Sequence, residues 1–146
     1  MPVKRDDPYA NFNFLVNVGD EAAAGFSEVQ LGAARVELIE YREGSDRTNT
    51  TRKLPGLVRY DNVVLRRGIA GDTTLWEWFD RIRDGEGETR DVEIVLLDEA
   101  RRPVVRWRLR NAMPVKWEGP TLRAQGNEVA LETLELAHEG LELDGA

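Results

Sequence analysis

The stretch TRKLPGLVRYDNVVLRRGIAGD, residues 51–72, decides much of the fold of this 146-residue chain. Its Pro-Gly pair at positions 55–56 predicts a turn, because proline presets one turn position and glycine accepts the conformation of the next. The run NVVLRR, residues 62–67, predicts a short strand that GIAGD then interrupts. The stretch is also basic in a chain whose formal net charge is −7, and its five cations are Arg52, Lys53, Arg59, Arg66 and Arg67.

The residues that follow carry the clearest helical pattern in the sequence. Over residues 72–85 (DTTLWEWFDRIRDG), Leu75, Phe79 and Ile82 recur at helical spacing and predict one buried stripe. Asp72 is a suitable N-cap and Gly85 a suitable stop at the C-terminal end.

Two tryptophans on this helix indicate different environments. Trp76 borders the apolar stripe, whereas Trp78 is expected to turn away from it. A tryptophan opposite the stripe indicates either a second packing surface or a helix that its own domain covers on both sides. The sequence leaves both possibilities open.

Strand signals dominate the N-terminal third of the chain. Residues 9–19 (YANFNFLVNVG) alternate apolar and polar side chains, which predicts a strand with one buried face. Residues 26–31 suggest a second short strand. Residues 33–43 favour a third, because of their β-branched and aromatic content. The loop at 44–51 has no apolar residue and is long for a hairpin connection, as functional or mobile loops often are.

A β-hairpin is predicted after the helix, where residues 89–99 and 103–110 flank DEARR, with 112–117 as a further short strand. The arginines of RWRLR are expected on the face opposite the core. This face is a solvated sheet face in a monomer, and in an assembly it could line a cavity or meet an acidic neighbour. The expected core face of the hairpin carries Val92, Ile94, Leu96, Val105, Trp107 and Leu109.

The C-terminal segment, residues 127–143 (NEVALETLELAHEGLEL), carries two conflicting signals. Its Ala, Leu and Glu content favours a helix. Val129 and Leu131 share one alternation, however, while Leu134 and Leu136 share the opposite one. A strand with a bulge near residues 132–133 would produce that change of phase, and a strand is the interpretation we favour.

Composition predicts one domain over residues 1–146, with residues 1–8 as an N-terminal arm. The pI near 4.9 argues against specific nucleic-acid binding, which requires a basic surface. The absence of cysteine excludes disulfides and thiolate metal sites. No apolar run has the length of a membrane helix or a signal peptide, so the sequence predicts a chain made in the cytoplasm without a membrane anchor.

Signals of catalysis are weak. His138 is the only histidine, and no nucleophile, phosphate-binding or metal-binding motif accompanies it. Glu132 and Glu135 could be imagined as an acid–base pair, but glutamates on a strand are more often a solvated face. We therefore expect no enzyme, no metal and no cofactor.

Several ordered motifs resemble the inner tube proteins of contractile injection systems. They are IEYREG, a polar loop, RKLPGLVRYDNVVLRRGI and LWEWF. The start, DPYANFNFLVNV followed by GFSEV, is similar to that family's first strands, and NEVALETLELAHEGLEL to its last strand. The family includes the tail tube proteins of contractile-tailed phages and of extracellular injection particles, and the resemblance covers about residues 7–143.

This resemblance implies a mainly β fold, a small β-barrel or sandwich with one packed α-helix. It implies a structural subunit that forms hexameric rings, which stack into a hollow tube. It also implies sheath, baseplate and tube-terminator proteins as partners, and assembly in the cytoplasm as part of a phage tail or tail-like particle. A tube-initiating or baseplate-adaptor paralogue would look the same at this level, and a monomeric β-barrel that binds a small ligand is the alternative from another class.

Two groups of candidate site residues result. The resemblance implies that the long loop reaches towards the adjacent ring, and the polarity of the helix suggests its acidic residues as a sheath-facing surface. The loop group is Arg42, Glu43, Ser45, Asp46, Arg47, Arg52 and Lys53, and the helix group is Glu77, Asp80 and Asp84.

Overall fold

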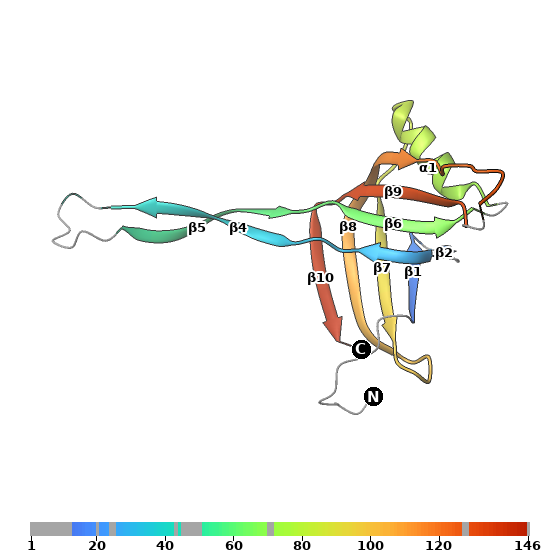
Figure 1. Ribbon diagram of the computed structural model, residues 1–146. Helices are drawn as coiled ribbons and strands as arrows, with labels where there is room; N and C mark the ends of the chain where they lie inside the picture. The colour runs from blue at the N-terminus through green and yellow to red at the C-terminus, as the bar shows by residue number, and fades with distance from the viewer. Residues whose placement is uncertain are drawn as a thin grey trace.

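The computed structural model describes residues 13–19, 21–23, 26–42, 44, 51–69, 72–126 and 129–145. The predicted arm at residues 1–8 lies outside them. Ten strands and one helix run through this part of the chain (Figure 1). In chain order they are β1 (Phe14–Val18), β2 (Glu21–Ala23), β3 (Phe26–Gln30), β4 (Ala34–Tyr41), β5 (Arg52–Tyr60), β6 (Val63–Gly68), α1 (Thr74–Arg83), β7 (Arg90–Leu97), β8 (Pro103–Glu118), β9 (Leu131–Ala137) and β10 (Gly140–Gly145).

Eight strands form two antiparallel layers that share β8. The first layer has the order β2-β1-β7-β8-β10, and the second has the order β8-β9-β6-β3. β8 is a single strand of 16 residues that pairs with β7 and β10 in its first half and with β9 in its second. No pairing links β2 to β3 within the described residues, so the sandwich stays open along that side. The prediction of a mainly β fold with one helix is confirmed.

The core lies between the two layers. Alternate positions of β1, β6, β7, β8 and β9 point inward, as strands with one buried face require. The register pairs Val92 with Leu109 and Ile94 with Trp107, as predicted for the hairpin. The inward residues that are at most 5% exposed include Val16, Val18, Val63, Leu65, Val92, Ile94, Leu109, Leu134 and Leu136.

The helix forms where predicted, with a shift at its start. It begins at Thr74, so Thr73 holds the N-cap position and Asp72 lies one residue further out. The Asp72 carboxylate still accepts the Thr74 backbone N–H at 3.0 Å. At the other end Gly85 has φ +79°, and the N–H groups of residues 85 and 86 bond to the carbonyls of Ile82 and Arg81. These two bonds form a Schellman motif, which confirms the stop at Gly85.

The orientation predicted for Trp78 was wrong. Its side chain is 2% exposed, packs in the core beside Leu75, and donates its indole N–H to the carbonyl of Glu88 at 2.9 Å. Trp76 is the half-buried one, with its ring 4.8 Å from that of Trp117. Trp78 is three residues from Leu75, so the two share a face of the helix. The domain itself covers this side of the helix.

The turn predicted at residues 54–56 was also wrong, because Pro55 and Gly56 lie inside β5. Between Val36 and Leu38 the register shifts, so Glu37 of β4 faces both Gly56 and Leu57 of β5, which form a bulge. Pro55 itself pairs with Leu38. A Cβ on Gly56 would lie 3.0 Å from the carbonyl oxygen of Glu37. The glycine therefore allows the two strands to approach closely.

Two further strand boundaries differ from expectation. Residues 112–117 are not a separate strand, because β8 continues through Asn111, whose φ of 51° marks the corner between the two layers. β9 is a strand, as favoured, but it has no bulge near residues 132–133, since its register with β6 is unbroken. The phase change arises because Leu131 is 38% exposed and Glu132 occupies the buried face.

Candidate assembly surfaces

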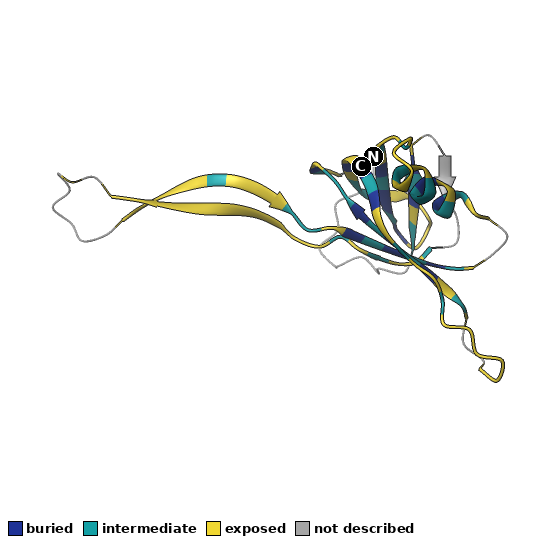
Figure 2. Cartoon of the chain, turned by 90° about the horizontal axis from the view of Figure 1, so that it is seen from above, coloured by how far each residue is buried: buried dark blue, intermediate teal, exposed yellow. Residues whose placement is uncertain are grey.

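The β4–β5 ribbon projects from the body of the molecule as a long two-stranded arm (Figure 1). Every residue of β4 is exposed, and so is most of β5 (Figure 2). Apolar side chains lie on both of its faces, because Leu38 and Ile39 are neighbours in one strand. Its exposed large apolar residues are Val36 (57%), Leu38 (58%), Ile39 (50%), Tyr41 (46%), Leu54 (45%), Leu57 (65%) and Val58 (54%).

Polar contacts join the two strands at the base of the ribbon, and an aromatic contact joins this base to the body. Asp61 accepts the backbone N–H of Ala33 at 3.1 Å and lies 3.3 Å from the Arg35 guanidinium. The Tyr60 ring lies 5.2 Å from that of His138, whose Nδ1 is 3.1 Å from the carbonyl of Gly140. His138 is thus a packed structural residue at this junction. An apolar ribbon that is held firmly at its base but bare along its length is typical of an element that another chain covers.

The described residues of the predicted loop group fall at the far end of this ribbon. Arg52 and Lys53 are the first residues of β5, where they lie opposite Tyr41 and Glu40 and are exposed. Arg42 follows β4 and is also exposed. The remaining loop residues, Glu43, Ser45, Asp46 and Arg47, lie outside the described residues.

The acidic residues predicted on the helix lie on its outer side. Glu77 is exposed and accepts the Thr73 hydroxyl at 3.1 Å. Asp80 pairs with Arg83 one turn later, and Asp84 is exposed at the C-terminal end. Of the three, only Asp80 is in an ion pair within the described part of the chain.

A buried ion pair joins the second layer to the start of the helix. Arg67 of β6 is 4% exposed, and its Nε lies 2.5 Å from Oε1 of Glu132 on β9. Glu132 also accepts the Trp117 indole N–H at 3.0 Å. Arg67 donates to both the carboxylate and the carbonyl of Asp72, at 3.2 and 3.1 Å. The Thr74 hydroxyl and backbone N–H, with Arg67, lower the pKa of Asp72.

This network corrects the expectation that Glu132 belongs to a solvated face. Glu132 and Glu135 lie on opposite faces of β9, and Glu135 accepts the side-chain amide of Asn62 at 3.1 Å. They cannot act as an acid–base pair, because their carboxylates point to different sides of the sheet. Sequence reasoning missed Glu132, although its position two residues before Leu134 matches the core alternation.

The arginines of RWRLR form a mixed-charge surface on the outer face of the first layer. Arg106 and Arg108 approach Glu93 of β7 at 3.4 and 3.9 Å, and Arg110 lies 3.2 Å from Glu142 of β10. Each arginine therefore meets a carboxylate of its own sheet. These cross-strand pairs favour the interpretation as a solvated face over that of a surface that meets an acidic neighbour.

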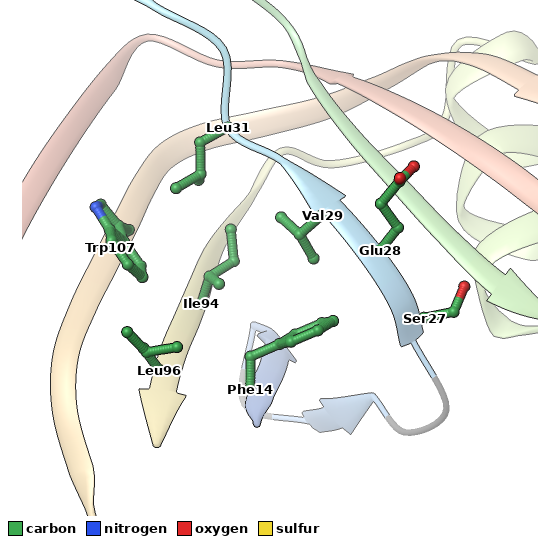
Figure 3. A pocket seen from close by; sticks show the side chains of 8 residues that line it. All are labelled: Phe14, Ser27, Glu28, Val29, Leu31, Ile94, Leu96 and Trp107. Atoms are coloured by element: carbon green, nitrogen blue, oxygen red, sulfur yellow. The ribbon is translucent and has the colours of Figure 1, made fainter. Parts of the chain in front are cut away.

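An apolar groove of about 430 Å3 opens between β3 and the first layer (Figure 3). It follows from the open side of the sandwich, because among the described strands β3 pairs only with β6. Figure 3 shows the side chains of Phe14, Ile94 and Leu96 gathered below Val29 of β3. The full lining is Phe14, Ser27, Glu28, Val29, Leu31, Ile94, Leu96 and Trp107.

Within the described residues, no three His, Asp or Glu side chains are grouped so that they could hold a metal ion. Nor does this part of the chain contain a helix of the length and apolarity that crossing a membrane requires. What stands out is a pair of apolar surfaces, the ribbon and the groove, rather than a reaction centre.

Comparison with known proteins agrees with this geometry. Residues 10–142 match the family described as T4-like virus tail tube protein gp19. The chain belongs to this family. No curated protein sequence matches it.

Solved structures of contractile injection systems share both fold and sequence with the chain. One is a chain of the PVC sheath–tube complex, an extracellular contractile injection system, in its extended state. It is 28% identical with a TM-score of 0.86, over 97% of this chain and 94% of that one. Another comes from the anti-feeding prophage tube-terminating cap, 27% identical with a TM-score of 0.86, over 100% of this chain and 97% of that one.

A more distant likeness concerns the fold alone. Hcp1 from Flavobacterium johnsoniae is 15% identical, with a TM-score of 0.56 over 91% of this chain and 95% of that one. The family match and the two injection-system structures, not this distant likeness, show that the chain is a structural tail tube protein of contractile injection systems.

Proposed function

We propose that six copies of this chain close into a ring and that the rings stack into the hollow tube of a phage tail or tail-like injection particle. The observation that carries this proposal is the ribbon, whose apolar side chains are exposed on both faces. A lone two-stranded ribbon of this kind is marginally stable in water, so burial against other copies accounts for its sequence. The particle assembles in the cytoplasm.

The ribbon and its loop connect adjacent rings in this proposal. Arg42, Glu43, Ser45, Asp46, Arg47, Arg52 and Lys53 set the register of stacking, because charged residues fix orientation more than strength. Deletion of residues 44–51 should leave single rings and stop stacking. Negative-stain microscopy distinguishes these states, and long tubes formed by the deletion variant would contradict the role of the loop.

The helix faces the sheath in the assembled particle. Glu77, Asp80 and Asp84 form its outer acidic side, which suits a basic strip on a sheath protein. The triple change to lysine should leave tubes intact and abolish sheath coating. A lysine at Glu118, which is exposed at the end of β8, is the matched control. Normal sheath coating of the triple variant would rule the surface out.

The same fold also suits a tube-initiating or baseplate-adaptor subunit. The observation in its favour is a match to a chain of the anti-feeding prophage baseplate, which is 29% identical with a TM-score of 0.79 over 97% of this chain and 98% of that one. A main tube subunit should polymerise into long tubes on its own, whereas an initiator should stop at one or a few rings. Tube length in the purified protein separates the two.

A further inference from the structure

A pocket of about 230 Å3 opens where the start of α1 meets the end of β8 and the start of β9 (Figure 1). Two half-buried indoles line it, Trp76 of α1 and Trp117 of β8, in an edge-to-face arrangement with 4.8 Å between the ring centroids. The pocket is smaller than the roughly 300–1,000 Å3 of small-molecule sites, so a single side chain suits it better than a small ligand. Its lining among the described residues is Ile69, Asp72, Thr73, Trp76, Trp117 and Glu132.

The pocket lining has an excess of negative charge. Asp72 and Glu132 contribute carboxylates, and no lining residue within the described chain is cationic. Arg67 pairs with both carboxylates, at 3.2 and 2.5 Å, and so balances only one of the two charges. Hydrogen bonds from Thr74, together with Arg67, lower the pKa of Asp72, so its carboxylate is charged at neutral pH. The cluster therefore keeps one net negative charge beside two aromatic rings.

Arg83, a further cation near the pocket, does not balance this charge, because it pairs with Asp80. Its guanidinium lies over the Trp76 ring, 5.4 Å from the ring centroid, and tryptophan is the aromatic residue that attracts cations most strongly. Glu77 adds a carboxylate beside the pocket, where it accepts the Thr73 hydroxyl at 3.1 Å. An occupant with an aliphatic stem and a cationic head would match both the indoles and the carboxylates.

We propose that this pocket receives one lysine or arginine side chain of the sheath protein. The inference rests on the proposed function, in which α1 faces the sheath, and adds a receptor pocket to it. The pocket is continuous with the acidic side of α1, because Thr73 lines it and also binds Glu77 of that side. A protein that covers Glu77 therefore also reaches the pocket. A cation suits this place better than an apolar side chain, because pairing lowers the cost of covering an uncompensated carboxylate.

The first test removes the unbalanced charge. Asp72→Asn can still accept the Thr74 backbone N–H. It also leaves Arg67 balanced by Glu132, so the subunit should fold and form tubes. We expect this variant to need at least about tenfold more sheath protein for half-maximal coating, because a covered charge pair has lost one partner. Asp72→Glu keeps the charge and should be coated like the parent. Urea unfolding of the free subunits records any separate loss of stability.

Asp98→Asn is the matched control. Asp98 likewise accepts a backbone N–H and pairs with an arginine, Arg102, but it lies in the β7–β8 loop, at the opposite end of the body from α1 (Figure 1). Its substitution removes the same charge from the chain and should leave sheath coating unchanged. Coating of Asp72→Asn at the sheath concentration of the parent would overturn the inference, and so would an equal loss of coating in Asp98→Asn.

A cross-link identifies the occupant. The chain has no cysteine, so Ile69→Cys places a single thiol on the pocket lining, to which a benzophenone maleimide is attached. In sheath-coated tubes, illumination should join position 69 to a sheath segment with a lysine or arginine at or beside the linked residue. Leu15→Cys, exposed on the outer face of the first layer, is the control and should capture no sheath. A link from position 69 to another tube copy, to a sheath segment without a basic residue, or to no protein at all would overturn the inference.

Failure of the proposed function would give different results from failure of the pocket. A parent chain that forms no tubes, or whose tubes take up no sheath, would contradict the sheathed tube itself. A parent that is coated, beside an Asp72→Asn variant that is coated equally well, would contradict the pocket alone.

Discussion

Arg67 and Glu132 form a buried ion pair across β6 and β9, with 2.5 Å between Nε and Oε1 and less than a tenth of either side chain exposed. Core positions on both strands are otherwise apolar, from Val63 and Leu65 to Leu134 and Leu136. The pair also holds Asp72 and the Trp117 indole. It therefore ties the start of the helix to the middle of the second layer.

Removal of one partner should destabilise the subunit strongly. Glu132→Ala removes the buried partner of Arg67 and leaves only the half-exposed Asp72 carboxylate, 3.2 Å away, to balance its charge. A broken buried pair typically costs about 3–5 kcal/mol, and we expect a cost towards the lower end because Asp72 remains. Urea unfolding of the unassembled subunit measures the change in free energy. The double variant Arg67→Met/Glu132→Leu is the control, and it should recover most of the loss because it leaves no lone charge. A single variant as stable as the parent would contradict the structural importance of the pair.

We predict that the stability of the fold depends on pH through Asp98, in the loop between β7 and β8. Asp98 accepts the Arg102 backbone N–H at 2.8 Å, which lowers the pKa of its carboxyl below the usual 3.8. Because the folded pKa is the lower one, the carboxylate stabilises the fold above pH 3.8, and this contribution is lost as the pH falls through the folded pKa. Asp98→Asn should therefore be less stable than the parent at pH 7, and the two should converge in strong acid. A stability difference that stays constant from pH 7 to strong acid would contradict this prediction.

We predict that alanine substitutions at the two glycines after the helix lower stability to different extents. Gly85→Ala places a side chain at φ +79° and should cost about 1 kcal/mol. At Gly87 a Cβ would lie 2.6 Å from the backbone nitrogen of Ile82, so Gly87→Ala requires the chain to shift and should cost more. The thermal unfolding midpoints of the two variants show which substitution costs more stability. A more stable Gly87→Ala would contradict the close approach.

We predict that polar substitutions on the ribbon weaken assembly without lowering the stability of the subunit. Leu38→Asp and Leu57→Asp change side chains that are more than half exposed, so each should alter subunit unfolding by less than about 0.5 kcal/mol. Both should weaken tube formation, because they remove apolar area that other copies bury. Urea unfolding and tube yield are measured on the same preparations. A large loss of subunit stability would show that the ribbon packs on its own body.

The sequence predicted the elements that local pattern determines. Helix α1, the β7–β8 hairpin and the Gly85 stop depend on spacing and on backbone preferences, which act within a few residues. The prediction from sequence failed where the contact partner of a residue lies far away in the chain. Glu132 was taken for a surface residue because its partner, Arg67, is 65 positions distant. Pro55 and Gly56 signal a turn locally, yet both lie within β5, where Pro55 pairs with Leu38 and Gly56 is part of a bulge.

The sequence contains a pattern that indicates the ribbon, although the strand prediction for residues 33–43 did not use it. In VELIEY, residues 36–41, apolar side chains occur in both alternation phases, at Leu38 and at Ile39. A strand with one buried face does not need this pattern, whereas a strand covered on both faces does. The groove left no comparable sign, because it depends on how β3 and the first layer meet.

The most direct test of the tube assignment is negative-stain microscopy of the purified chain beside its Leu38→Asp/Leu57→Asp variant at equal concentration. We predict long tubes of uniform width for the parent chain, and isolated rings of the same diameter for the variant. A parent chain that remains monomeric at high concentration, or a variant that forms tubes as long as those of the parent, would contradict the assignment of the ribbon as the element that joins rings into a tube.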